Sequence, residues 1–291
     1  MRRGNAMLLA GVCAAAVVAM PALAAAVRPP GPAEPVPLPT TPPALTTSVA
    51  TTATSAPSVI PVPGLPAGAE LADLAPGRLS VLVHDRRIGR DLVSHLPDAP
   101  YPAASLVKLL IAFEALRQGE PAGVVAELLS RSDDEIADRL WTKLGGPAIV
   151  TGWAARIGMT SIRPPADPGR WGSTVVTAAD VVRCYRYLLD AAPATTRQIV
   201  LRALGGTARR GADGFDRLFG IPAAVTATDW AVQQGWSCCD PGRDLHTSGV
   251  VGDRRYVVVV LSAQPAVVSW ANAARRVTAV VKALSHPLGW S

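Results

Sequence analysis

A serine and a lysine three residues apart are the strongest chemical signal in this sequence. Ser105 and Lys108 open an apolar run that extends to Leu116 and is typical of a helix. The spacing places both side chains on one helix face, one turn apart. A desolvated lysine can lose its proton and accept that of a neighbouring hydroxyl, which activates the serine without histidine. The chain has three lysines, yet this spacing alone also fits a helix cap beside a solvated charge.

The elements around this pair must position it, and their order is strands, then helices, then strands. Polar and apolar residues alternate at 78–84 as in a strand, and a second strand is predicted at 92–96. The first helix is predicted to run from Ser105 to Gln118. Further helices are predicted at 121–129, 135–143, 147–157, 177–189 and 195–204. The C-terminal part predicts strands at 229–237, 245–251 and 255–262, and a helix at 267–284.

This order predicts an α/β fold of the α+β type in one domain, residues 67–291. The strands from both ends of the domain would form one antiparallel sheet, which the first and last helices would cover. The middle helices would form a separate helical lobe. A domain of this length is able to bury a sizeable core.

The N-terminal segment predicts export. A charged start and an apolar stretch precede a small-residue cleavage site at 22–24, so residues 1–26 are expected to be a signal peptide. Val12 stands before Cys13, where a lipidation site requires a small residue, so cleavage is favoured over a lipidated or retained anchor. Residues 27–66, rich in proline, threonine and alanine, are expected to be a disordered tether. The expected location is the cell envelope or the medium.

Composition narrows the partners and cofactors. The net charge of +6 is mild and the arginines are scattered, so no nucleic-acid partner is expected. No histidine stands at ligand spacing beside the cysteines, so we expect no metal and no cofactor. In an oxidising compartment a disulfide would join Cys238 to Cys239, or Cys184 to one of them. A monomer is expected.

The order of these elements, with Ser-x-x-Lys at the start of the first helix, resembles the serine β-lactamase and penicillin-binding protein superfamily. Within it, the chain is similar to the actinobacterial, alanine-rich lipoproteins of the LppW type from mycobacteria, which share a Ser-Asp-Asp and a Gly-Trp-x-Cys-Cys. The resemblance covers residues 79–284. Ser132-Asp133-Asp134 stands where that superfamily has Ser-Asp-Asn, and Gln233-Gln234-Gly235 stands where it has Lys-Thr-Gly.

The resemblance implies a role for each of these residues. Ser105 would attack the carbonyl of a β-lactam-like ligand or of a peptidoglycan D-alanyl peptide, and Lys108 would take the serine proton. Ser132 would relay a proton to the leaving nitrogen. The backbone amides of Ser105 and Trp236 would form an oxyanion hole. The secondary members of the site would be Asp134, Gln233, Gly235 and Trp236.

Three departures from the superfamily pattern predict a degenerate site. Gln233 removes the positive charge of the strand lysine, and Asp134 adds a negative charge where a neutral amide is expected. Both changes disfavour a substrate carboxylate. Glu135 is the last glutamate in the chain, so the loop before Thr177 cannot carry the glutamate that activates a deacylating water. Asp167 is the one acid in that loop and is typical of a turn.

These observations favour an exported, β-lactamase-like protein with little or no β-lactam turnover. The alternative is an active penicillin-binding or D-alanyl peptidase-type enzyme that uses Ser105 and Lys108. A third interpretation is a serine hydrolase that uses the same pair on an ester. Read without the resemblance, Ser132 to Asp134 predicts only the N-cap of the following helix.

Overall fold

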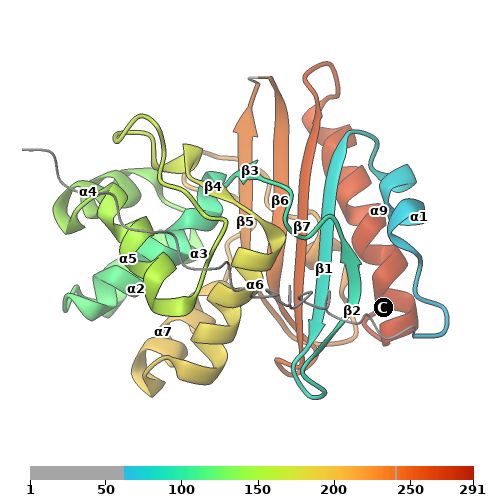
Figure 1. Ribbon diagram of the computed structural model, residues 1–291, viewed down its shortest axis with the longest axis horizontal. Coiled ribbons are helices and arrows are strands. Elements are labelled where there is room, and N and C mark those ends of the chain that lie inside the picture. Colours follow the sequence, from blue (N-terminus) through green and yellow to red (C-terminus); the bar gives the residue numbers. More distant parts are fainter. Residues whose placement is uncertain (1–61, 240) are drawn as a thin grey trace, which may run out of the picture. The chain divides into compact units, whose positions relative to one another are not determined.

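The computed structural model describes residues 62–239 and 241–291 (Figure 1). The predicted signal peptide and all but the last five residues of the predicted tether lie outside the described residues. Within the described part, one five-stranded antiparallel sheet has the order β2-β1-β7-β6-β5. Its strands are β1 Arg78–Asp85, β2 Arg90–His95, β5 Trp230–Cys238, β6 Gly242–Val251 and β7 Tyr256–Pro265. The predicted single sheet, built from both ends of the domain, is therefore confirmed.

The register of the sheet joins the N-terminal hairpin to the C-terminal meander. β1 pairs along its whole length with β7, from Arg78 opposite Ala263 to Asp85 opposite Tyr256. The four valines at 257–260 in β7 are buried on both faces of the sheet, as a central strand requires. β5 is an edge strand, so one of its sides is free to border a cleft.

Helices α1 Gly68–Leu74 and α9 Trp270–Leu288 cover one face of the sheet (Figure 1). Val81 and Val83 of β1 and Val277 and Val281 of α9 belong to the same buried apolar cluster. α9 begins where the Ser269 side chain accepts a hydrogen bond from the amide of Asn272. The short helix α8 Ile221–Ala224 packs beside α9.

The other face carries the helical lobe, as predicted (Figure 1). Its helices are α2 Lys108–Arg117, α3 Ala122–Ser130, α4 Asp134–Leu144, α5 Pro147–Ile157, α6 Ala178–Arg186 and α7 Ala194–Gly205. α2 is buried without interruption from Lys108 to Ala115, so it is the central helix of the lobe. None of the described helices combines the length and apolarity that a membrane crossing requires.

Some local features differ from the sequence-based expectation. The first predicted helix begins with a 3-10 turn, η1 Ala104–Val107, before α2. The helix predicted at 177–189 becomes α6 followed by a π-helical turn, η3 Tyr187–Ala191. A small two-stranded sheet, β3 Tyr101–Pro102 with β4 Val175–Val176, was not predicted, because two-residue strands carry no periodicity. A second 3-10 turn, η2 Trp171–Ser173, lies in the loop before β4.

Among the described residues, Cys238 and Cys239 form the disulfide, and Cys184 is a free thiol. Of the three pairings that the sequence left open, the structure has the one between neighbours. Cys184 is buried in the lobe, and burial raises the pKa of its thiol. Thiolate chemistry at Cys184 is therefore disfavoured.

Candidate functional site

Ser105 lies in the η1 turn at the junction of sheet and lobe. The residue before it, Ala104, has a φ of 46°, a left-handed conformation that alanine rarely adopts. Such strain is typical of functional sites, where packing holds an unfavourable backbone in place. Strand β5 passes close to this turn at Gly235. A Cβ atom there would lie 3.1 Å from the Ala103 carbonyl oxygen and 3.3 Å from Leu106 Cγ, so this approach favours glycine.

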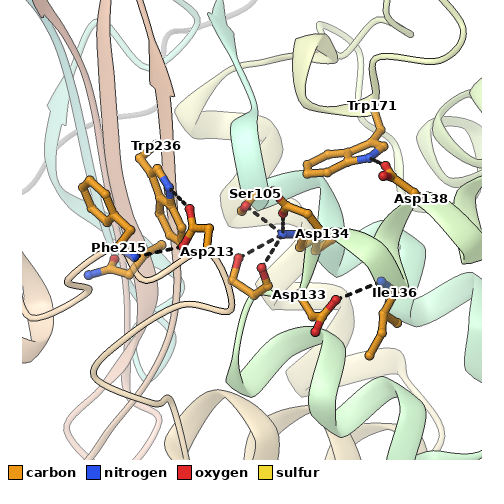
Figure 2. Close-up of polar contacts among 12 residues, drawn as sticks. Ser105, Asp133, Asp134, Ile136, Asp138, Trp171, Asp213, Phe215 and Trp236 are labelled. Carbon is orange, nitrogen blue, oxygen red and sulfur yellow. Dashed lines mark hydrogen bonds and ion pairs between the residues drawn. The ribbon is translucent and has the colours of Figure 1, made fainter.

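Lys108 is completely buried at the centre of the site. Its Nζ lies 3.0 Å from Ser105 Oγ, 3.1 Å from Ser132 Oγ and 2.8 Å from the Ser132 carbonyl oxygen. It also forms an ion pair with Asp134 (Figure 2). The expected contact between Lys108 and Ser105 is present. An ammonium has three protons, so it cannot donate fully to all four oxygens at once.

Ser132 reaches Lys108 through a strained turn between α3 and α4. Its φ is 52°, and its amide donates to the Leu129 carbonyl over 3.3 Å. The next residue, Asp133, caps α4 by accepting a hydrogen bond of 2.9 Å from the amide of Ile136 (Figure 2). The segment is therefore the predicted helix cap and also brings a second serine to the lysine.

Three effects act on the Lys108 amine. Burial lowers its pKa and is the largest effect. The carboxylate of Asp134 opposes this shift, and the buried guanidinium of Arg217 adds to it. The net direction is downward, which favours the neutral amine that a general base requires.

Two tryptophans stand on either side of Ser105 (Figure 2). Trp171 comes from η2, and its ring centroid lies 4.8 Å from Lys108 Nζ. Its indole N–H donates to Asp138 over 2.6 Å. On β5, the indole N–H of Trp236 donates to Asp213 over 2.9 Å, and its ring stacks on Phe215 at 4.7 Å. Each ring is thus fixed by a carboxylate.

These groups border one cleft of about 530 Å³. Ser105, Asp134, Trp171 and Trp236 line it, together with Asp167, Arg170 and Asp244. Ser105 and Trp236 therefore face the same space, which is the arrangement that the motifs predicted. Whether the Trp236 amide serves as an oxyanion donor stays a prediction.

Gln233 does not take part in this cleft. It is fully buried, and its Nε2 donates to the Gln234 carbonyl over 3.2 Å. Gln234 is also buried and donates to the carbonyls of Arg217 and Phe219. Strand β5 thus presents no positive charge at the place where the superfamily has its lysine.

The loop before Thr177 uses its acid locally. Asp167 Oδ1 accepts the amide of Gly169 over 2.9 Å, a turn contact of the kind expected for this residue. Thr177 caps α6, since its Oγ1 accepts a hydrogen bond from the amide of Asp180 over 3.1 Å. Among the described residues, no group of three or more histidine, cysteine or acidic side chains is placed to hold a metal.

Sequence reasoning missed Arg217 and the position of Trp171. Arg217 lies between α7 and α8 and is 1% exposed, and it donates to the carbonyls at the end of α3. Burial lowers its pKa to about 10. An arginine in an irregular segment predicts a solvated side chain, so the sequence carries no signal for this burial.

The antiparallel sheet, the helical lobe and the Ser-Lys-Ser contact at their junction define the fold of the class A serine β-lactamases. The structure matches a β-lactamase of Chitinophaga pinensis with a TM-score of 0.65 at 15% identity, covering 75% of this chain and 96% of the other. It matches an ancestral class A β-lactamase with a TM-score of 0.61 at 22% identity, covering 74% and 96%. At such identities the likeness shows the fold alone.

Among sequences, this chain is similar to the lipoprotein LppW of Mycobacterium tuberculosis and of Mycobacterium bovis. The identity is 39% over 202 residues in each case, 65% of this chain and 64% of the relative. The aligned part thus spans less than two thirds of either protein. No family model matches the sequence. The predicted similarity to LppW is confirmed in sequence, and the predicted resemblance to the serine β-lactamases is confirmed in fold.

Proposed function

We propose that this protein is an exported, envelope-located member of the β-lactamase fold whose Ser105 site turns over β-lactams slowly or not at all. The observation that carries the proposal is the loop at 161–173. It contains no glutamate, and its one acid, Asp167, accepts a hydrogen bond from its own turn. Trp171 of the same loop covers Lys108 instead. An acyl group on Ser105 would therefore meet no activated water, and loss of such a group costs about 10²–10⁴-fold in rate.

Capture of a carboxylate-bearing ligand is weakened as well. Gln233 is buried and neutral, and Asp134 places a carboxylate in the cleft. At an effective dielectric constant near 20, two charges about 4 Å apart interact by about 4 kcal/mol before desolvation. The exposed Asp134 contributes less than this because solvent screens it. The cleft therefore opposes the carboxylate of a penicillin.

The proposed location rests on the export-type N-terminus and on the lipoprotein name of the relative LppW. The N-terminus is proposed to be cleaved, with anchoring through it as the alternative. The proposed ligand is a peptidoglycan D-alanyl peptide or a β-lactam-like compound, bound by a monomer. The fold of the class A β-lactamases supports this class of ligand.

A second function is an active acyl-serine enzyme of the penicillin-binding or D-alanyl peptidase type. The contacts that favour it are the 3.0 Å from Lys108 Nζ to Ser105 Oγ and the 3.1 Å to Ser132 Oγ. These distances suit proton transfer from a nucleophile and to a leaving group. Such an enzyme would acylate and also release its product.

Intact-mass spectrometry with a reporter penicillin tests the choice. The purified domain and its Ser105→Ala variant are incubated with the reporter, and the protein mass is followed over time. The absence of an adduct supports the proposed function, whereas a Ser105-dependent adduct that forms readily and persists for hours identifies a working penicillin-binding enzyme and overturns it. An adduct that forms and is lost within seconds, and that is absent from Ser105→Ala, overturns it in favour of the enzyme.

A further inference from the structure

Arg217 is a buried cation beside the candidate site. Among the described residues it forms no salt bridge, and Asp213 acts on its charge without a direct hydrogen bond. Its Nη1 donates to the Ser130 carbonyl over 2.5 Å, and its Nη2 approaches the Leu129 carbonyl at 3.4 Å. Its Nε has no hydrogen-bond partner among the described residues. Burying a charge without a salt bridge costs free energy of folding. We therefore asked which contacts of Arg217 serve the candidate site.

The two carbonyls belong to the turn that presents Ser132. They end α3, where a cation is favoured by the helix dipole. The Leu129 carbonyl also accepts the amide of Ser132, whose backbone is left-handed. Arg217 is therefore bonded to the turn that brings the second serine to Lys108.

Strand β5 holds Arg217 from the other side. Gln234 donates to the Arg217 carbonyl over 3.1 Å and to the Phe219 carbonyl over 2.8 Å. Gln233 and Gln234 stand where the superfamily has the lysine and threonine of its strand motif. Strand β5, which has Gln233 at the position of the superfamily lysine, thus holds the segment that carries the cation of Arg217.

The charged groups that act on Lys108 come from two elements besides its own helix. Asp134 at the start of α4 and Asp213 in the segment before α8 favour the ammonium form of Lys108. Arg217, from the same segment as Asp213, favours the neutral amine. Arg217 is thus the buried cation that opposes the two acids.

We propose that Arg217 is a positioning residue that replaces the missing strand lysine: it holds the Ser132 turn and supplies the fixed positive charge that opposes Asp134 at Lys108. The proposal rests on the proposed function only in so far as chemistry at Ser105 would use this lysine. The charge state of Lys108 itself is measurable without any substrate.

Nuclear magnetic resonance of lysine labelled with ¹³C at Cε tests the proposal directly. The chain has three lysines, and Lys108 is buried whereas Lys143 and Lys282 are exposed, so its titration is separable from the others. Arg217→Met removes the buried charge and keeps an apolar side chain in its place, a change that buried charges often tolerate. We expect the titration midpoint of Lys108 to rise by about one pH unit.

Arg209→Gln is the matched control, because it removes an exposed arginine from the same segment. Its Lys108 midpoint should stay within about 0.2 unit of the wild-type value, since solvent screens an exposed charge. Asp134→Asn should move the midpoint downward. A folded Arg217→Met variant with an unchanged Lys108 midpoint would show that Arg217 is merely structural and would overturn the proposal.

Arg217→Lys carries the test if the methionine variant does not fold. It retains the charge, and its own new signal is identified by comparison with the wild-type spectrum. The Lys108 midpoint should then stay within about 0.3 unit of wild type, and a rise of one unit or more would overturn the proposal. Because neither readout needs an acyl adduct, failure of the proposed function at Ser105 leaves this test intact.

Discussion

On the helical side of the cleft, polar groups converge on one atom, whereas on the strand side they turn away from the ligand space. Lys108 Nζ lies within hydrogen-bond distance of both Ser105 and Ser132. By contrast, Gln233 of β5 is buried against its own strand, and Asp167 of the facing loop bonds its own turn. Under the proposed function, the helical side supplies a nucleophile, and the strand side and the loop lack the groups that would capture a carboxylate and activate water. If the proposed function is correct, acylation at Ser105 and release of the acyl group depend on different parts of the cleft.

Removing the nucleophile of the helical side, Ser105, should have the largest effect. Ser105→Ala should abolish every covalent adduct with an acylating probe, because no other hydroxyl shares both Lys108 and the cleft in the described structure. Intact-mass spectrometry checks this. Ser161→Ala is the control and should label as wild type does, because Ser161 does not line the cleft. An adduct of unchanged yield in Ser105→Ala would place the reactive group elsewhere.

The strand side should be partly repaired by restoring its charges. Gln233→Lys combined with Asp134→Asn restores a cation and removes an anion, so labelling by benzylpenicillin should rise at least about tenfold over wild type. Each single substitution should give a smaller gain. The rate of adduct formation at Ser105 is the measurement. If the double variant labels no faster than wild type, the charges at positions 233 and 134 do not explain the weak capture of penicillin.

The close approach of β5 to the η1 turn should be sensitive to a single methyl group. Gly235→Ala places a Cβ atom 3.1 Å from the Ala103 carbonyl oxygen, and overpacking of this kind costs about 1–3 kcal/mol. Urea unfolding reports the change. Gly152→Ala is the matched control: it lies inside α5 with open space around its Cβ and should stabilise by about 0.5–1 kcal/mol. Equal changes in the free energy of unfolding at both positions would contradict the close packing of β5 against the η1 turn.

Lys108→Met should raise the free energy of unfolding by about 1 kcal/mol. The reason is that the folded protein buries the Lys108 amine, and burial disfavours its charged form and lowers its pKa. Below the ordinary lysine pKa of about 10.4, the unfolded chain binds the proton more readily than the folded one. Wild-type stability should therefore rise with pH towards that value, and the variant should lack this rise. Lys143→Met, at an exposed ion pair, should change stability by less than about 0.5 kcal/mol. Urea unfolding between pH 7 and 10 checks both statements; a destabilised Lys108→Met would contradict them.

Much of the fold could be predicted from the periodicity of apolar residues and from the glycines and prolines that end helices and form turns. The alternation at β1, the apolar run at α2 and the glycines after α4 and α5 predicted their elements to within a few residues. These signals are local, and local propensity agrees here with the final packing. The Ser-x-x-Lys spacing likewise placed two groups on one face before any tertiary contact was known.

The rest of the site depends on contacts that no local pattern encodes. Arg217 is buried because β5 and the end of α3 enclose it, and its sequence neighbourhood resembles an ordinary polar loop. Trp171 covers Lys108 because Asp138 of α4 holds its indole. Contacts between segments 17 to 87 residues apart in the sequence decide both positions, so the sequence predicted the nucleophile better than its surroundings.

Steady-state hydrolysis of nitrocefin by the wild-type protein tests the central claim most directly. We expect turnover far below the ordinary enzymatic range, at or only slightly above that of Ser105→Ala, because the loop at 161–173 supplies no group to activate water. A turnover number in the ordinary enzymatic range, about 1–10³ s⁻¹, that disappears in Ser105→Ala would contradict it.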